Sequence, residues 1–66
     1  MNITVNGESR TVTDGTSLQA LLEEMAVCAD ALVVQRNDDI VGRDAFATTK
    51  LADGDALELV RFVGGG

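Results

Sequence analysis

The chain has 66 residues, 45% of them hydrophobic, and eleven acidic against five basic side chains give a net charge of −6. This length fits one small domain, the apolar content is too high for a disordered chain, and the acidic balance argues against binding to nucleic acid. With one cysteine and no histidine, a disulfide-stapled scaffold and a structural zinc site built from Cys and His are excluded.

The first predicted element is a β-hairpin. Residues 3–5 alternate apolar and polar side chains, as a half-buried strand does. Asn6-Gly7 is the strongest short hairpin signal, because both residues tolerate a positive φ. Residues 10–13 are predicted to be the returning strand, and Asp14-Gly15 is a second turn signal.

A helix is predicted next. Thr16 is a suitable N-cap, and Gln19 three residues later completes a capping-box pattern. One apolar stripe at helical spacing follows, made of Leu18, Leu21, Leu22 and Met25. We expect this helix to end between residues 26 and 30.

Residues 31–35 form a short apolar and β-branched run, which predicts a strand buried on both faces. A turn is predicted over 37–39 and a brief strand over 40–41. Residues 43–50 are expected to contain a helical turn that points Phe46 inward.

Asp53-Gly54-Asp55 predicts a turn and not a calcium site, which needs many more oxygen ligands at set spacing. Residues 57–63 then predict a last, central strand. This order of elements predicts an α+β fold, the β-grasp or ubiquitin-like arrangement, with a mixed sheet of four to five strands and one main helix on one face. The first and last strands are expected to lie parallel in its middle. We expect residues 1–63 to form the domain and 64–66 a flexible glycine tail.

Catalysis within the chain is not expected. There is no histidine, and the carboxylates are scattered, mostly at turns and off the helix stripe. Cys28 has no basic neighbour in sequence that would lower the pKa of its thiol, so it is interpreted as a partly buried, unreactive residue. No metal site is predicted. Because no run approaches the roughly 18–20 apolar residues of a membrane span and residues 1–4 do not resemble a signal peptide, we expect a cytoplasmic protein.

The C-terminal glycines Gly64, Gly65 and Gly66 directly follow the last predicted strand. Glycine has no Cβ, so this tail is thin, and its three residues reach about 10 Å when extended, enough to enter a narrow channel in another protein. A bare terminal carboxylate is a poor acyl electrophile, so chemistry at Gly66 requires activation, for example adenylation with ATP.

Short matches to one protein family run through the chain: Val5-Asn6-Gly7, Thr16-Ser17-Leu18, Leu21-Leu22, Asn37, Ile40-Val41, Arg43, Leu51, Asp53-Gly54-Asp55 and residues 57–66. Through these residues the whole chain resembles the ThiS family, the sulfur carrier proteins of thiamine biosynthesis. Two positions depart from the pattern. Gly42 stands where the family usually has proline, and Arg36 stands where an apolar residue is common.

The resemblance implies a carrier and not an enzyme. A ThiF-like adenylating enzyme would use ATP with Mg²⁺ to adenylate Gly66, and a sulfur donor such as a cysteine desulfurase would supply the sulfur of a thiocarboxylate. The carrier would then donate that sulfur to a ThiG-like thiazole synthase. Gly64 and Gly65 would let the tail thread into both enzymes, with no cofactor bound stably to the carrier.

The last strand fixes where the tail leaves the domain. Leu57 and Leu59 are interpreted as core residues. The side chains expected to contact partners are Phe62, Arg61, Glu58 and Arg43.

Three alternatives remain open from the sequence. The chain could be a sulfur carrier of another pathway, similar to the small subunit of molybdopterin synthase, or a ubiquitin-like protein modifier. It could be a non-covalent β-grasp interaction module whose tail has no role. An enzyme that uses Cys28 is the third, and it predicts that Cys28→Ser abolishes activity.

Overall fold

A computed structural model describes residues 1–27 and 32–61 of the chain. The predictions that concern Cys28, Phe62 and Gly64 to Gly66, and the expected boundary after residue 63, lie outside these residues. The described elements are β1 (Asn2–Val5), β2 (Glu8–Thr11), α1 (Leu18–Glu24), β3 (Leu32–Arg36), β4 (Asp39–Val41), the 3-10 turn η2 (Arg43–Ala45) and β5 (Ala56–Arg61).

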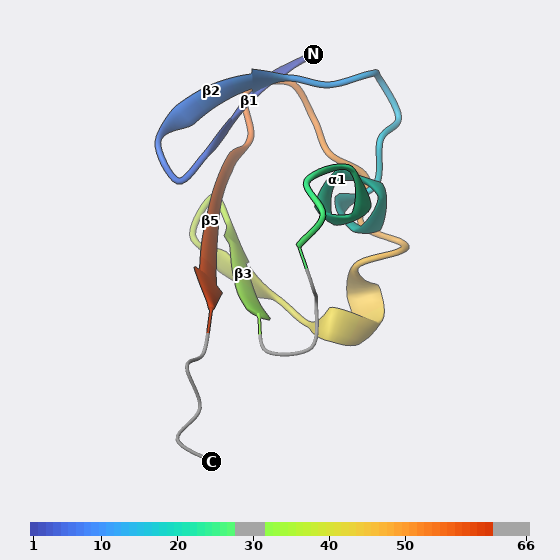
Figure 1. Ribbon diagram of the computed structural model, residues 1–66, viewed down its shortest axis with the longest axis vertical. Helices are drawn as coiled ribbons and strands as arrows, with labels where there is room; N and C mark the ends of the chain where they lie inside the picture. Colours follow the sequence, from blue (N-terminus) through green and yellow to red (C-terminus); the bar gives the residue numbers. More distant parts are fainter. Residues whose placement is uncertain (28–31, 62–66) are drawn as a thin grey trace.

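The strands form one sheet of five in the order β2-β1-β5-β3-β4, with β5 in the centre. β1 and β5 are parallel, and every other pair is antiparallel. The helix α1 packs across one face of this sheet (Figure 1). The predicted β-grasp arrangement is therefore confirmed, including the parallel pairing of the first and last strands.

The hairpin of β1 and β2 turns at Asn6 and Gly7, whose φ values are 51° and 83°. Val5 and Glu8 are direct partners across the sheet, so the loop holds only the two predicted residues. This tight turn starts β2 at Glu8, two residues earlier than the alternation of the sequence indicated.

The N-cap of α1 is Ser17 and not the predicted Thr16. The Ser17 hydroxyl accepts a hydrogen bond from the backbone N–H of Ala20 at 3.1 Å. Ser17 is held in extended geometry by a β-bridge to Lys50, which delays the helix by one residue. Thr16 instead donates its hydroxyl to the carbonyl of Thr13.

The helix ends earlier than predicted, at Glu24, with Met25 as C-cap. Ala26 follows with a φ of 57°. The N–H of Ala26 bonds the carbonyl of Glu23, and the N–H of Val27 bonds the carbonyl of Leu22. This is the Schellman pattern of a helix end. Alanine stands at the position that glycine usually takes, so the sequence had no glycine that would have indicated where the helix ends.

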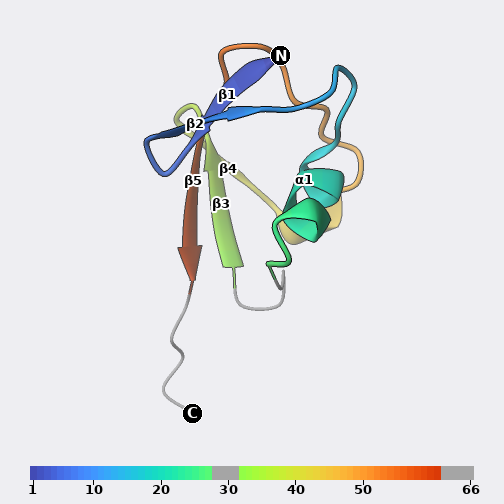
Figure 2. The same ribbon diagram turned by 45° about the horizontal axis from the view of Figure 1, so that its top comes forward.

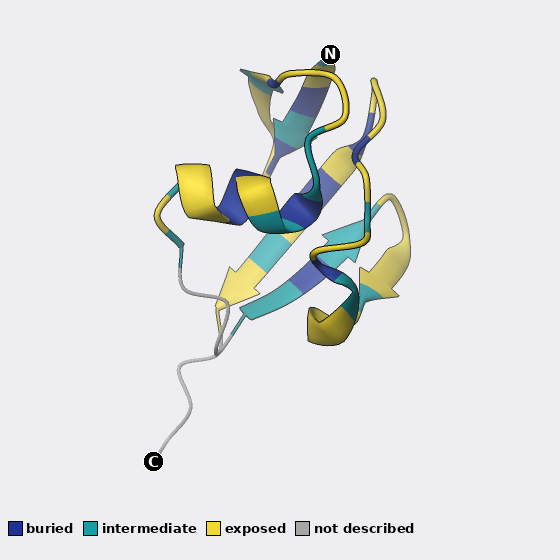
Figure 3. Ribbon diagram, turned by 90° about the vertical axis from the view of Figure 1, so that its right-hand side faces the viewer, coloured by how far each residue is buried: buried dark blue, intermediate teal, exposed yellow. Residues whose placement is uncertain are grey.

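The core lies between α1 and the inner face of the sheet (Figure 3). Three stripe residues of the helix, Leu18, Leu21 and Leu22, are fully buried, and Phe46 points inward as predicted. The other large, fully buried side chains come from the strands and are Ile3, Val34 and Leu57.

The outer face of the sheet has no cover among the described residues, as Figure 2 shows for β3 and β5. The prediction that β3 is buried on both faces is therefore wrong. Val34 on the inner face is buried, whereas its neighbour Val33 on the outer face is only half-buried. No helix in the described part of the chain is long and apolar enough to span a membrane.

Candidate functional site at the carboxyl end of β5

The central strand β5 carries the candidate site, because the predicted tail begins shortly after its last residue, Arg61. Its neighbours hold it along most of its length. β1 pairs with its first residues, Ala56 and Leu57, and β3 pairs with it from Leu57 to Arg61. The strand thus leads straight from the centre of the sheet to one end of the molecule (Figure 2).

Side chains of β5 alternate between the two faces of the sheet. Leu57 points into the core and is 1% exposed, and Leu59 is half-buried against the same core. The interpretation of both as core residues is confirmed for Leu57 and holds in part for Leu59. Glu58 and Val60 lie on the outer face and are exposed.

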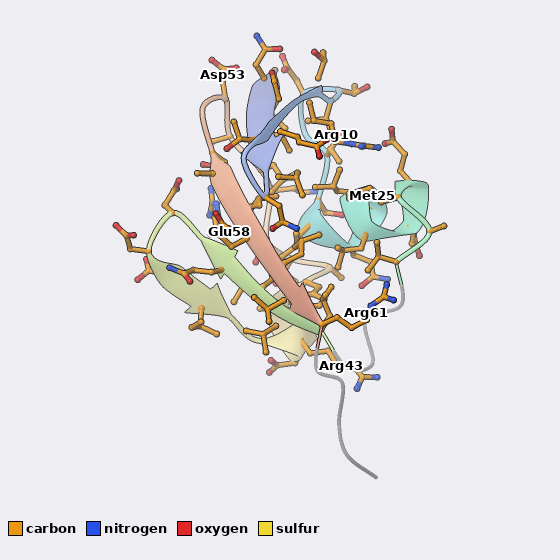
Figure 4. All side chains as sticks on the ribbon, turned by 60° about the vertical axis from the view of Figure 1, so that its left-hand side comes forward. Arg10, Met25, Arg43, Asp53, Glu58 and Arg61 are labelled. Carbon is orange, nitrogen blue, oxygen red and sulfur yellow. The ribbon has the colours of Figure 1, made fainter. Side chains whose placement is uncertain are left out.

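The three described residues predicted to contact partners do not form one cluster. Arg61 is exposed at the end of β5, and Arg43 is exposed in η2. Both lie at the end of the molecule where β5 stops (Figure 4). Glu58 lies farther back along β5, on the opposite face from Arg61 and across from Gln35.

An apolar patch on the outer face of the sheet was not predicted from the sequence. Val60 is 57% exposed and Ile40 is 67% exposed. Val33 lies opposite Val60, and Ile40 lies on the same face beyond β3. We call Val33, Ile40 and Val60 the outer patch. The sequence contained a signal for this patch, because the alternation of side chains along a strand places Val33 and Val60 on the other face of the sheet from Val34 and Leu59.

A second residue whose role was missed is Asn6, which was predicted only as a turn residue. Its side-chain oxygen accepts a hydrogen bond from the N–H of Leu59 at 2.7 Å. Its side-chain N–H donates to the carbonyl of the same residue at 3.4 Å. Asn6 therefore takes the place of a further β1 residue and fixes β5 two residues before Arg61.

The other end of β5 is held by the buried carboxylate of Asp55, which is 5% exposed. It accepts hydrogen bonds from Arg36 Nε at 2.8 Å, Asn37 Nδ2 at 3.2 Å and the backbone N–H of Ala52 at 2.8 Å. Arg36, which departs from the family pattern, thus has a specific partner. Burial by itself would raise the pKa of Asp55, but these hydrogen bonds and the charge of Arg36 outweigh it and lower the pKa below its ordinary value.

A cavity of about 160 Å³ lies between the hairpin and α1, lined by Val5, Asn6, Glu8, Ser9, Arg10 and Met25. Pockets for small molecules usually have about 300–1,000 Å³. In the parts of the chain that the structure describes, no three Cys, Asp or Glu side chains gather in an arrangement suited to a metal ion.

Comparison with known proteins agrees with this geometry. The model of the ThiS family matches residues 3–66. The sulfur carrier protein ThiS of Bacillus subtilis is 36% identical over 53 residues, which cover 80% of each chain. A crystal structure of the thiamine biosynthesis protein ThiS from Geobacter metallireducens is 39% identical and superposes with a TM-score of 0.87, covering both chains completely.

The chain is also similar to part of a larger enzyme. A thiazole synthase of Paramagnetospirillum magneticum is 39% identical over all 66 residues. The chain spans only a fifth of the length of this protein.

Proposed function

The chain belongs to the ThiS family, and we propose that it is a sulfur carrier protein of thiamine biosynthesis. The observation that carries this proposal is the family match through residue 66, together with a central strand that leads toward the glycine tail. The Bacillus relative supports it, because that protein is named as a sulfur carrier.

The proposed chemistry takes place at the carboxylate of Gly66. A carboxylate oxygen attacks the α-phosphorus of ATP, and pyrophosphate leaves. The terminal sulfur of a persulfide on the donor then displaces AMP from the acyl-adenylate, which gives an acyl disulfide. A second thiol attacks the sulfur of the donor, forms a disulfide with it and releases the thiocarboxylate. The acceptor takes up this sulfur, and an oxygen from its carbonyl group or from water replaces it and restores the plain carboxylate. ATP and Mg²⁺ belong to the activating enzyme, so the carrier itself is a co-substrate and not a catalyst.

Three partners are proposed. A ThiF-like enzyme adenylates Gly66, and a donor such as a cysteine desulfurase supplies sulfur. A ThiG-like thiazole synthase accepts it. The last partner is supported by thiazole synthases that contain a segment similar to this chain, because two proteins joined in one polypeptide commonly act together. The cytoplasm remains the expected location.

Docking is proposed at the end of the molecule where β5 stops. Arg61 and Arg43 lie there, and Phe62 follows Arg61 directly. The outer patch offers exposed apolar area, and Glu58 lies on the same face next to it. Fully buried apolar contacts contribute most to binding energy, whereas charges at the rim mainly affect the association rate.

The proposal is tested by intact mass spectrometry of Cys28→Ser protein purified from its own host, with a thiol-alkylating reagent present at lysis. We expect one adduct that maps to Gly66, because only a thiocarboxylate remains to be alkylated. A chain that lacks Gly65 and Gly66 serves as the control and should fold normally without any adduct. If only the plain carboxylate is found while the sulfur-transfer enzymes are overproduced, the carrier function is refuted and a passive interaction module is favoured.

A further inference from the structure

We propose that the adenylating enzyme takes up the tail by strand addition, with an extended segment of the enzyme pairing with the edge of β5 that faces β1, beginning at Arg61. This inference rests on the proposed carrier function. It concerns how the tail is recognised, which neither the family match nor the similar proteins describe.

The hydrogen-bonding direction of β5 is the first line of evidence. On the side of β1, the N–H of Thr4 bonds the carbonyl of Asp55 at 2.9 Å, and the N–H of Asn6 bonds the carbonyl of Leu57 at 2.8 Å. The odd-numbered residues of this strand therefore direct their backbone groups toward β1. The even-numbered residues face β3, as the bond from the N–H of Asn37 to the carbonyl of Ala56 shows.

The second line of evidence is where this pairing stops. β1 ends at Val5, and the hairpin turns away at Asn6 and Gly7. The side chain of Asn6 satisfies both backbone groups of Leu59. The next residue whose backbone groups face this edge is Arg61. In the described part of the chain, its N–H and carbonyl form no hydrogen bond on this edge.

The composition of the tail is the third line of evidence. Gly64, Gly65 and Gly66 have no side chains that a partner could recognise, so only backbone N–H and C=O groups are available for recognition there. A polypeptide that recognises such groups in register does so by pairing as a neighbouring strand. The edge at Arg61, where the described residues provide no backbone partner, is the point where that pairing begins, because β3 already holds β5 in strand geometry up to this residue.

Charge favours an enzyme segment over a second copy of this chain as the occupant. Arg61 is exposed at this edge, and Arg43 lies at the same end of the molecule (Figure 4). Two copies that paired here would bring like charges together, which destabilises cross-strand pairs. We therefore expect an acidic side chain on the enzyme segment that lies beside Arg61.

The test removes one backbone donor at a time from a chemically synthesised chain. An ester in place of the amide between Val60 and Arg61 deletes the N–H of Arg61. The matched control places the ester between Arg61 and Phe62, one residue along, because in the proposed strand pairing successive N–H groups face opposite edges and this one would face away from the enzyme segment. Pyrophosphate release with the adenylating enzyme and ATP gives kcat/KM for each chain.

We expect the ester at Arg61 to lower kcat/KM about 3- to 10-fold, as loss of one hydrogen bond predicts, and the control to change it less than about twofold. The midpoint of thermal unfolding of the ester at Arg61 should fall by no more than about 4–8 °C, because its N–H has no described partner in the free protein and only the bond accepted by the Val60 carbonyl, which faces β3, is weakened. Equal effects of both esters, or none at Arg61, would overturn strand addition. If the unmodified chain is not adenylated at all, the carrier function itself fails, and the inference fails with it.

A second measurement needs no modified backbone. In the free chain, amide hydrogen exchange should be slow at Leu59, which is bonded to Asn6, and fast at Arg61. Binding of the adenylating enzyme in the absence of ATP should slow exchange at Arg61 at least tenfold. Unchanged exchange at Arg61 in a complex that is demonstrably formed would refute the proposed pairing.

Discussion

Replacing Asp55 by asparagine should be among the most destabilising single polar substitutions in this protein. The side-chain oxygen Oδ2 of Asp55 accepts both Arg36 Nε and the N–H of Ala52, and Oδ1 accepts Asn37. An asparagine has nearly the same shape, but in either orientation its NH₂ group faces donors. In the better orientation the asparagine oxygen keeps Arg36 and Ala52 as donors, and only the hydrogen bond from Asn37 is lost, at about 1.5 kcal/mol. The two bonds that remain lose a charged acceptor and weaken by about 0.5 kcal/mol each, so the total loss is about 2–3 kcal/mol.

The matched variant Arg36→Leu should cost less, about 1 kcal/mol. Asp55 keeps its bonds from Ala52 and Asn37 in that variant, and the Arg36 side chain is already 31% exposed, so less interaction is lost. The double variant should therefore be less destabilised than the sum of the two single variants, by about 1–2 kcal/mol. Asp38→Asn is the control, because Asp38 is an exposed turn residue, and it should change stability by no more than about 0.5 kcal/mol.

Urea unfolding followed by far-ultraviolet circular dichroism measures these differences, because the chain has no tryptophan or tyrosine for fluorescence. For a domain of this size, each kcal/mol corresponds to about 4–8 °C in the midpoint of thermal unfolding. A cost below about 1 kcal/mol for Asp55→Asn, or costs that simply add in the double variant, would refute the assignment of Asp55 as the residue that anchors β5.

Three further predictions concern stability. The pKa of Asp55 is lowered in the folded state, so its contribution to stability is present above the unfolded pKa and is lost as the pH falls through the folded pKa. The midpoint of urea unfolding should therefore decrease as the pH falls below about 4, and it should decrease less steeply in Asp55→Asn. Ala26→Gly should stabilise the protein by about 1 kcal/mol in urea unfolding, because Ala26 has a φ of 57°, and a loss of stability would contradict the assigned helix end. Gly42→Pro should raise the thermal midpoint by about 2–8 °C, because Gly42 has φ −68° and its N–H bonds no described backbone carbonyl. The side chain of Asp44 must shift to make room for the ring, and a lower midpoint would show that it does not.

The elements that the sequence predicted correctly depend on short-range patterns. The Asn6-Gly7 turn requires two residues with positive φ, and the helix stripe requires leucines three and four residues apart. Both patterns remain visible without knowledge of the fold. The strand order followed from them, because a hairpin, one helix and later strands can bury their apolar faces in few ways.

Other misassigned or missed details depend on contacts between residues far apart in the sequence. Ser17 replaced Thr16 as N-cap because the chain at Lys50 pairs with it. The bond between Leu59 and Asn6 spans 53 residues, and the pair of Arg36 and Asp55 spans 19. No local pattern distinguishes an asparagine that only turns the chain from one that also holds a distant strand.

The constraints along β5 decrease from its first residue to its last. Asp55 anchors the chain just before the strand, Leu57 is buried in its first half, and Asn6 holds Leu59 near its end. At Arg61 the register with β3 continues, but its backbone groups face the edge of β1 and have no backbone partner among the described residues. This order fits the proposed carrier function, because a firmly held strand fixes where the chain leaves the domain, while the backbone of Arg61, which has no partner among the described residues, is available for the proposed pairing with the adenylating enzyme. Substitutions near Asp55 should therefore lower stability with little change in adenylation by folded protein, and changes at Arg61 or beyond should do the reverse.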